Sequence, residues 1–300
     1  MTLSAGRFTL HRKDGSIRPG WAVFVFALIV GAGAGLERVL GGLTLGWDFW
    51  FRVRFGDPSL AVALFGRAAW AVVATWLACR MVHWPMGDAY LRDARWWRRV
   101  LQGMGLGVVM LAFVSLAPVA FGHQQFRASK DGLFELAATF FWGALACVWI
   151  ALSEELWTRG YALRQLHRAV GNWGAAVGTG LWFGLMHGAN PGATWLAIFN
   201  VALVGVWLAL TVYRTGSMWL AIGFHFTWDF LELFFWGEPL SGGPGRASIF
   251  VRLPSNADLW TGGEFGPEAG LPNTVMLSAL ILLFALWPKR RHLPPPGQES

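Results

Sequence analysis

Eight long apolar stretches constrain the fold of this chain more than any other feature of its sequence. Each is long enough to cross about 30 Å of hydrocarbon as a helix of about 20 residues. The chain is 55% hydrophobic and only 14% charged, and the alternating ten-residue pattern of an outer-membrane barrel is missing from it. We therefore expect an all-α, polytopic transmembrane helical bundle with about eight spans. The stretches lie at 20–36, 59–83, 101–121, 132–153 or slightly later, 173–190, 193–213, 216–236 and 272–288.

Basic residues are concentrated in alternate loops. One set of alternate loops carries 15 basic residues, and the intervening loops carry only seven although they are longer in total. The positive-inside rule then predicts cytoplasmic N- and C-termini. Because topology accounts for the net charge of +7, we expect no nucleic-acid partner. The 15 are Arg7, Arg12, Lys13, Arg18, Arg92, Arg95, Arg98, Arg99, Arg159, Arg164, Arg168, Arg214, Lys289, Arg290 and Arg291.

Ionisable residues interrupt the apolar sequence at three places. A charged side chain is costly in hydrocarbon, so such residues mark candidate functional sites. A spacing of four residues places His225 and Asp229 on one helix face, and it does the same for Glu155 and Arg159. The residues that interrupt the apolar runs are Glu154, Glu155, His187, His225 and Asp229.

A structural role explains each of these residues when it is taken alone. A single intramembrane histidine commonly bonds a neighbouring helix, and Glu155–Arg159 is explained as an ion pair at the membrane boundary. The whole set is explained better by one shared site, because short turns make the spans that carry it neighbours. Such a site requires the helix that begins near 132 to continue to about Leu166, so that Glu154 lies in the middle of the membrane.

Glycine spacing in the fifth apolar stretch predicts close helix packing. Gly174 and Gly178 are four residues apart, and so are Gly180 and Gly184. Because these positions leave one helix face without side chains, a neighbouring helix can approach it closely. A site built from several helices needs such an approach.

Two schemes for amide hydrolysis fit these residue types, and the residues alone leave both open. In the first, a glutamate beside a histidine removes a proton from water, and His225 donates to the oxyanion while Asp229 fixes its tautomer. In the second, two histidines and carboxylates hold Zn²⁺ with one open coordination position. The sequence has no H-E-x-x-H, G-x-S-x-G or G-x-G-D motif, which argues against the common zinc, serine and aspartyl types.

Three ordered motifs resemble those of the CPBP intramembrane proteases, the group that includes the type II CAAX prenyl proteases and the bacterial Abi-type proteins. The family pattern is EExxxR, FxxxH and Hxxx(N/D). The resemblance covers roughly 133–235, about a third of the chain. The matching motifs are Glu154-Glu155-x-x-x-Arg159, Phe183-x-x-x-His187 and His225-x-x-x-Asp229.

This resemblance implies an intramembrane endopeptidase that cleaves near the C-terminus of a membrane-associated protein or peptide. It favours a glutamate mechanism without a cofactor, with Zn²⁺ as the alternative. The base is then Glu154 with His187, and the oxyanion side is His225 with Asp229. Since ionised Asp229 stands where prenyl-protease members carry Asn, it is expected to orient His225 and not to donate. The implied catalytic set is Glu154, Glu155, Arg159, His187, His225 and Asp229.

The expected organisation has four parts. N-terminal spans at 1–131 precede a protease core at 132–236. An extracytoplasmic Gly/Pro-rich loop follows at 237–271, and a last span with a cytoplasmic tail occupies 272–300. A composition rich in Ala, Gly, Arg and Trp favours a bacterial source, so the expected location is the plasma (inner) membrane.

Two other functions compete with proteolysis. A non-catalytic membrane scaffold, or a bacteriocin-immunity-type protein of the same fold, would use the polar cluster for binding only. A proton-coupled transporter also uses intramembrane glutamates and histidines. The complete set of ionisable residues argues against the scaffold. The lack of an inverted repeat in the sequence argues against the transporter.

Overall fold

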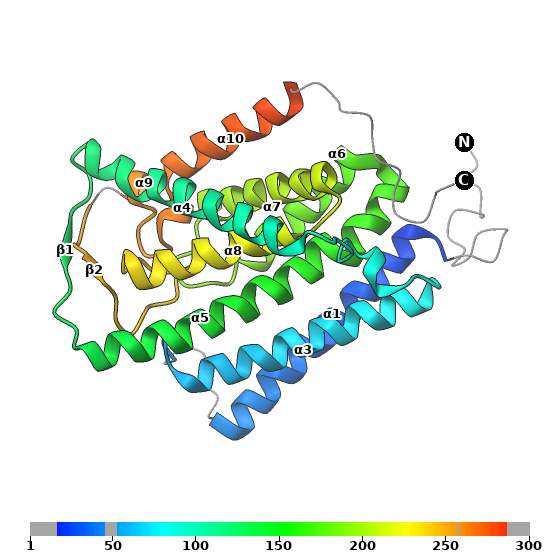
Figure 1. Ribbon diagram of the computed structural model, residues 1–300, viewed down its shortest axis with the longest axis horizontal. Helices are drawn as coiled ribbons and strands as arrows, with labels where there is room; N and C mark the ends of the chain where they lie inside the picture. The colour runs from blue at the N-terminus through cyan, green and yellow to red at the C-terminus, as the bar shows by residue number, and fades with distance from the viewer. Residues whose placement is uncertain (1–16, 46–52, 257, 287–300) are drawn as a thin grey trace.

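The computed structural model describes residues 17–45, 53–256 and 258–286, which are mostly helical (Figure 1). Among these residues, five helical segments are long and apolar enough to cross a membrane. The prediction of an all-α protein with several membrane-length helices is therefore confirmed. The segments are α1 (Pro19–Leu45), α3 (Pro58–Met81), α4 (Trp96–Ala120), the continuous α5–α6 segment (Leu133–Met186) and α7 (Trp195–Thr215).

Shorter elements connect and follow these segments. Helix α8 (Trp219–Phe230) continues into the π-helix η4 (Leu231–Phe235), and α10 (Leu271–Leu286) is apolar. Strand β1 (Phe126–Ala128) pairs antiparallel with β2 (Phe250–Arg252). The other short elements are η2 (Met86–Asp88), α9 (Asp258–Thr261) and η5 (Pro267–Ala269).

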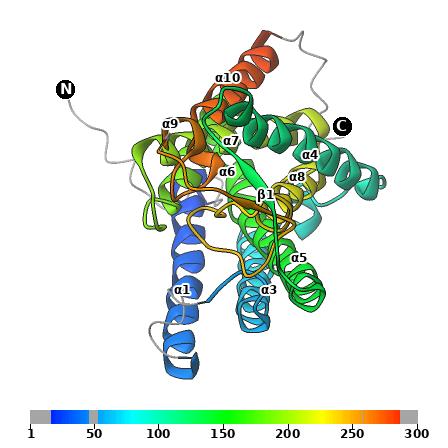
Figure 2. The ribbon, with the colours of Figure 1, turned by 90° about the vertical axis from the view of Figure 1, so that its left-hand side faces the viewer.

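The helices form a bundle in which α8 packs against α4, α5 and α7. The view from the end shows α1, α3 and α5 on one side of the bundle and α10 on the opposite side (Figure 2). Small residues bring α4 and α8 together, because a side chain at Gly103 would meet the backbone of Leu220. Likewise, one at Gly223 would meet the backbone of Val100. Close backbone approach at small residues is the usual way that membrane helices associate.

The glycines of α6 act in part as predicted. A side chain at Gly180 or Gly184 would collide with α7 near Ala202, so this pair allows the two helices to pack closely. A side chain at Gly174 or Gly178 would meet only side chains that precede it in the α5–α6 segment, and none on another described helix. The packing interpretation therefore holds for one pair of glycines and not for the other.

The helix that carries the two adjacent glutamates is longer than the stretch 132–153. Helix α5 (Leu133–Glu155) continues through the π-helix η3 (Leu156–Gly160) into α6 (Tyr161–Met186). Within α6, Gly171 has φ 73° and ψ −179°, and the chain turns back there, so that Gly178 packs against Leu166. Glu154 consequently lies near the middle of a long helix, as a shared site requires.

One assignment behind the topology prediction is wrong. Arg159 was assigned to a loop, yet its side chain is fully buried inside the long helix. Arg164 and Arg168 lie in the same helix, close to its end. Six basic residues that the prediction used lie outside the described residues: Arg7, Arg12, Lys13, Lys289, Arg290 and Arg291.

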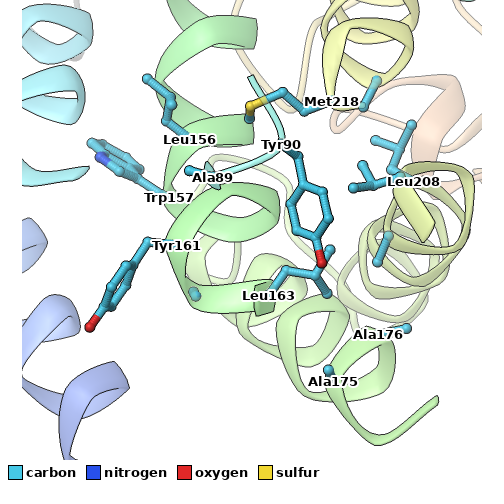
Figure 3. Packing of buried hydrophobic residues seen from close by; sticks show 14 of the residues in the cluster. Ala89, Tyr90, Leu156, Trp157, Tyr161, Leu163, Ala175, Ala176, Leu208 and Met218 are labelled. Atoms are coloured by element: carbon cyan, nitrogen blue, oxygen red, sulfur yellow. The ribbon is translucent and has the colours of Figure 1, made fainter. Parts of the chain in front are cut away.

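The main apolar core surrounds the part of the long helix that follows the glutamates (Figure 3). Tyr161 points toward α1, where the ring of Phe26 lies 5.1 Å from its ring (Figure 3), and the ring of Trp84, just after α3, lies 5.9 Å from it. Leu163 points to the other side, toward Tyr90 in the connection between α3 and α4. Because this helix is packed on both sides, its rotation is fixed, and so are the directions of the polar side chains two turns earlier.

Candidate functional site

The two adjacent glutamates lie where the long helix changes from α to π geometry. Glu154 and Glu155 end α5, and the next five residues form η3. The extra residue in a π turn changes the direction of the side chains around it, and such turns are frequent at functional sites. The Glu155 side chain is fully buried, whereas that of Glu154 is 12% exposed.

Glu155 forms a buried ion pair with Arg159 one turn later. Nη1 of Arg159 lies 2.9 Å from Oε1 of Glu155 and also donates to the Thr158 hydroxyl at 2.7 Å. The guanidinium carbon lies 4.3 Å from the ring centre of Phe183. Since a buried charge is tolerated only when it is paired and hydrogen-bonded, Arg159 and Glu155 hold each other in place.

His187 follows directly after α6 and faces Glu154. Its Nδ1 lies 2.9 Å from the carbonyl oxygen of Phe183, which can only accept a hydrogen bond. In the neutral ring, Nδ1 therefore carries the proton and Nε2 is left as an acceptor. Nε2 lies 3.9 Å from Oε2 of Glu154. The phenylalanine of the second motif thus orients the histidine through its backbone.

His225 is held by Glu155 and not by Asp229. Its Nδ1 lies 2.9 Å from Oε1 of Glu155, whereas Asp229 lies 3.6 Å from the other nitrogen, Nε2. The Nε2 atom is also 3.7 Å from Oε2 of Glu154. The expectation that Asp229 fixes the tautomer of His225 is therefore wrong. Spacing on one helix could not reveal a partner on another helix.

The structure thus brings all six sequence-predicted residues into one cluster on three segments of the bundle. We call this set, Glu154, Glu155, Arg159, His187, His225 and Asp229, the polar cluster. Oε2 of Glu154 and Oε2 of Glu155 are buried, and neither has a hydrogen-bond partner within the described part of the chain. The Glu154–histidine distances are too long for direct hydrogen bonds and fit contacts bridged by water.

A zinc site was the alternative interpretation of these residue types. A zinc ion needs ligand atoms at about 2.0–2.2 Å that converge on a common point. Over the described ranges, no group of three or more His, Cys, Asp or Glu side chains is arranged to hold a metal ion. The buried guanidinium of Arg159, paired with Glu155, also places a positive charge within the cluster, which opposes the binding of a cation. The observed arrangement does not fit a zinc ligand set.

The segment 237–271 packs beside the polar cluster, and sequence reasoning assigned it no chemistry. Phe265 of this segment packs with Phe183 in one apolar cluster. Asn200 of α7 holds the segment by donating to the carbonyl oxygens of Glu268 and Gly270 at 2.8 and 3.0 Å. Part of this loop is the short strand β2, which pairs with β1.

Glu268 brings a further carboxyl group toward the cluster from this segment. It accepts a hydrogen bond from Ser241 at 2.5 Å. Burial raises the pKa of Glu268, and the hydrogen bond from Ser241 and the nearby rings of His187 and His225 partly oppose this effect. No helical periodicity surrounds Glu268 in the sequence. An acidic residue in a Gly/Pro-rich loop was the only available signal.

Comparison with known proteins identifies the central part of the chain. Residues 136–231 match the family model described as "Type II CAAX prenyl endopeptidase Rce1-like". This match confirms the resemblance carried by the three motifs. It contains the whole polar cluster and covers about a third of the chain. No curated protein and no solved structure matches the chain significantly.

Proposed function

We propose that this Rce1-like domain is an intramembrane endopeptidase that hydrolyses a peptide bond near the C-terminus of a membrane-associated protein or peptide. One observation carries the proposal. Oε2 of Glu154 lies 3.9 Å from Nε2 of His187 and 3.7 Å from Nε2 of His225, inside a bundle of membrane-length helices. A carboxylate between two histidines at depth is costly, and general-base chemistry explains it.

In the proposed first step, Glu154 acts as the general base. Its carboxylate removes a proton from a water molecule that is also held by Nε2 of His187, which is free to accept because Nδ1 donates to Phe183. The water oxygen forms a bond to the substrate carbonyl carbon, and the C=O π electrons move onto the carbonyl oxygen. The product of this step is a tetrahedral oxyanion and a protonated Glu154.

In the second step, the oxyanion collapses and the C–N bond breaks. The protonated Glu154 returns its proton to the departing nitrogen, which leaves as an amine. The other product is a carboxylic acid, which ionises. The charges balance, since Glu154 ends the cycle as the carboxylate with which it began.

His225 is the proposed oxyanion donor. Its Nδ1 proton points at Glu155, so Nε2 must also carry a proton in order to donate. The carboxylates of Glu154, Glu155 and Asp229 lie within 3.7 Å of this ring and compensate the positive charge of the doubly protonated form. A donor fixed where negative charge develops lowers the barrier most effectively.

Glu155 and Arg159 are proposed as positioning residues. Glu155 holds His225, and Arg159 holds Glu155 and stacks on Phe183. Through this chain of contacts the arginine maintains the relative orientation of both histidines. Asp229 contributes negative charge near Nε2 of His225.

We propose eight spans with both termini in the cytoplasm. The turn at Gly171 divides Leu133–Met186 into two antiparallel spans, so the five membrane-length segments supply six crossings. Helix α8 with η4, and α10, would supply the other two. The domain boundaries at 132, 237 and 272 stay predictions. So does a location in the plasma membrane of a bacterium.

The test is proteolysis by the full chain in liposomes, with a panel of peptides that carry prenylated and unmodified C-terminal tails. The informative variants are Glu154→Gln and His187→Ala. A matched control is Glu135→Gln, which changes an exposed glutamate at the start of the same helix. We expect the first two variants to lose at least about 100-fold in cleavage rate, because a general base contributes that much or more. The control should retain wild-type activity.

Other outcomes separate the alternatives. Cleavage that persists with a strong chelator supports the glutamate mechanism. Cleavage that the chelator abolishes and added Zn²⁺ restores would instead support metal-assisted hydrolysis. If wild type and both variants behave alike in every assay, proteolysis is wrong. A scaffold or immunity function would then take its place.

A further inference from the structure

An open pocket lies at the end of α3, away from the polar cluster. Its volume is about 540 Å³. Arg164, which stacks on one of its walls, lies ten residues after Glu154 in the long helix, a rise of roughly 15 Å along the helix axis. The pocket is therefore separate from the proposed catalytic site. It is lined by Trp76, Arg80, His83, Trp84, Pro85 and Met86.

Positive charge converges on this pocket from two segments of the chain. Arg80 contributes from α3, with its guanidinium carbon 6.0 Å from the Trp76 ring centre. Arg164 and Arg168 of the long helix lie 4.2 and 5.3 Å from the ring centre of Trp84, on the pocket wall. Stacking on tryptophan fixes these guanidinium groups near the pocket without neutralising them.

Little negative charge opposes these groups. Asp88 is the nearby carboxylate, and it already pairs with Arg92 at 3.2 Å and Arg164 at 3.1 Å. Within the ranges that the structure covers, neither Arg80 nor Arg168 forms an ion pair with a carboxylate. Guanidinium groups present several donors in a plane and bind phosphate oxygens particularly well. The chemistry of the pocket therefore fits a phosphate group.

An apolar stripe on α3 connects this pocket to the lipid-facing surface. Val72, Val73, Trp76 and Leu77 are all exposed, and their spacing of about one helical turn places them on the face that leads to Arg80. An acyl chain lying along this stripe would bring its headgroup phosphate to the arginines. A free phosphate ion would make no use of the stripe, so the geometry favours a lipid.

We propose that this pocket binds the phosphate headgroup of an anionic phospholipid, whose acyl chains lie along the exposed face of α3. Basic pockets between membrane helices on the cytoplasmic side commonly hold such headgroups. The site goes beyond the proposed proteolytic function and does not depend on it. It would hold together the end of α3 and the end of the long helix, which carry Arg80 and Arg168.

The test measures lipid binding by native mass spectrometry on the full chain in neutral detergent. Phosphatidylglycerol, phosphatidylcholine and inorganic phosphate are the three probes. The test variant is Arg80→Gln with Arg168→Gln, and both side chains are exposed, so the fold should tolerate the change. The matched control is Arg98→Gln, an exposed arginine at the start of α4 that stacks on Trp97 at 5.1 Å.

We expect phosphatidylglycerol affinity to fall about 30-fold in the double variant, because each arginine near an anionic lipid is worth about five-fold. Arg98→Gln should change the affinity less than two-fold, by roughly the effect of one remote charge. A double lysine variant, Arg80→Lys with Arg168→Lys, should restore most of the binding. This rescue separates loss of charge from misfolding.

Three results would overturn the proposal. The first is unchanged phosphatidylglycerol binding in the folded double glutamine variant. The second is equal affinity of the wild type for phosphatidylcholine, since the pocket is inferred to select net negative charge. The third is displacement of phosphatidylglycerol by an equal concentration of inorganic phosphate, which would identify a free-phosphate site instead of a lipid site.

Discussion

Replacement of Arg159 by methionine tests how the polar cluster is held together. The arginine side chain is fully buried and lies 2.9 Å from Oε1 of Glu155, which is also fully buried. Arg159→Met keeps most of the side-chain volume and leaves the Glu155 charge with His225 as its remaining close partner. Breaking a buried ion pair from one side costs about 3–5 kcal/mol, because the other charge stays buried without compensation.

This cost is large enough to measure by thermal unfolding. One kcal/mol shifts the melting temperature of a large domain by about 2–4 °C, so we expect a decrease of roughly 10 °C. The free cysteines Cys79 and Cys147 are both buried, and a thiol-reactive dye in detergent will therefore report unfolding. Arg98→Met, an exposed replacement of the same kind, should melt within about 2 °C of the wild type.

The double variant Glu155→Gln with Arg159→Met is the decisive comparison. Glutamine removes the uncompensated charge and keeps a carbonyl oxygen that accepts from Nδ1 of His225. We expect the double variant to recover at least half of the stability that the single variant Arg159→Met loses. If the single variant melts like the wild type, or the double variant is no better than the single one, the ion pair does not hold the cluster together.

Three further predictions concern pH, packing and two of the three carboxylates near His225. Burial raises the pKa of Glu238 to about 7 from 4.5, so between these values the folded state alone keeps the proton. Stability should then fall as pH rises from about 4.5 to 7, and melting curves of Glu238→Gln should lack that dependence. Gly180→Leu should lower stability by about 1–3 kcal/mol in the same assay because it forces α6 away from α7, whereas Gly178→Ala should be tolerated. In the protease assay, Glu155→Ala should cost more than Asp229→Ala, by on the order of ten-fold, since Glu155 alone bonds Nδ1 of His225; equal losses would contradict this assignment.

Motif spacing predicted the members of the polar cluster but not their contacts. The interval of four residues correctly placed Asp229 near His225, yet it also suggested that Asp229 holds that ring. The hydrogen bond comes from Glu155, on another helix. Helical periodicity reports which residues share a face of one helix, and it carries no information about what faces them across the bundle.

Boundaries were harder to predict than the existence of the helices. The apolar run before Ser153 ends at polar residues, so hydropathy placed a helix end there. The helix in fact continues through η3 as far as Gly171. It can do so because the charges of Glu155 and Arg159 compensate each other through a buried ion pair inside the bundle. Hydropathy scores residues singly and cannot register such compensation.

Residue types and their spacing were enough to predict that this chain forms a helical membrane bundle and which ionisable residues gather within it. The reason is that the cost of burying charge in hydrocarbon acts on residue type alone. Helix packing was needed to show which carboxylate bonds which histidine, and that the segment 237–271 packs beside the cluster. Those facts depend on the rotation of each helix and the path of each loop. They are set by packing contacts such as Gly180 against α7 and Phe265 against Phe183, which are distant in the sequence.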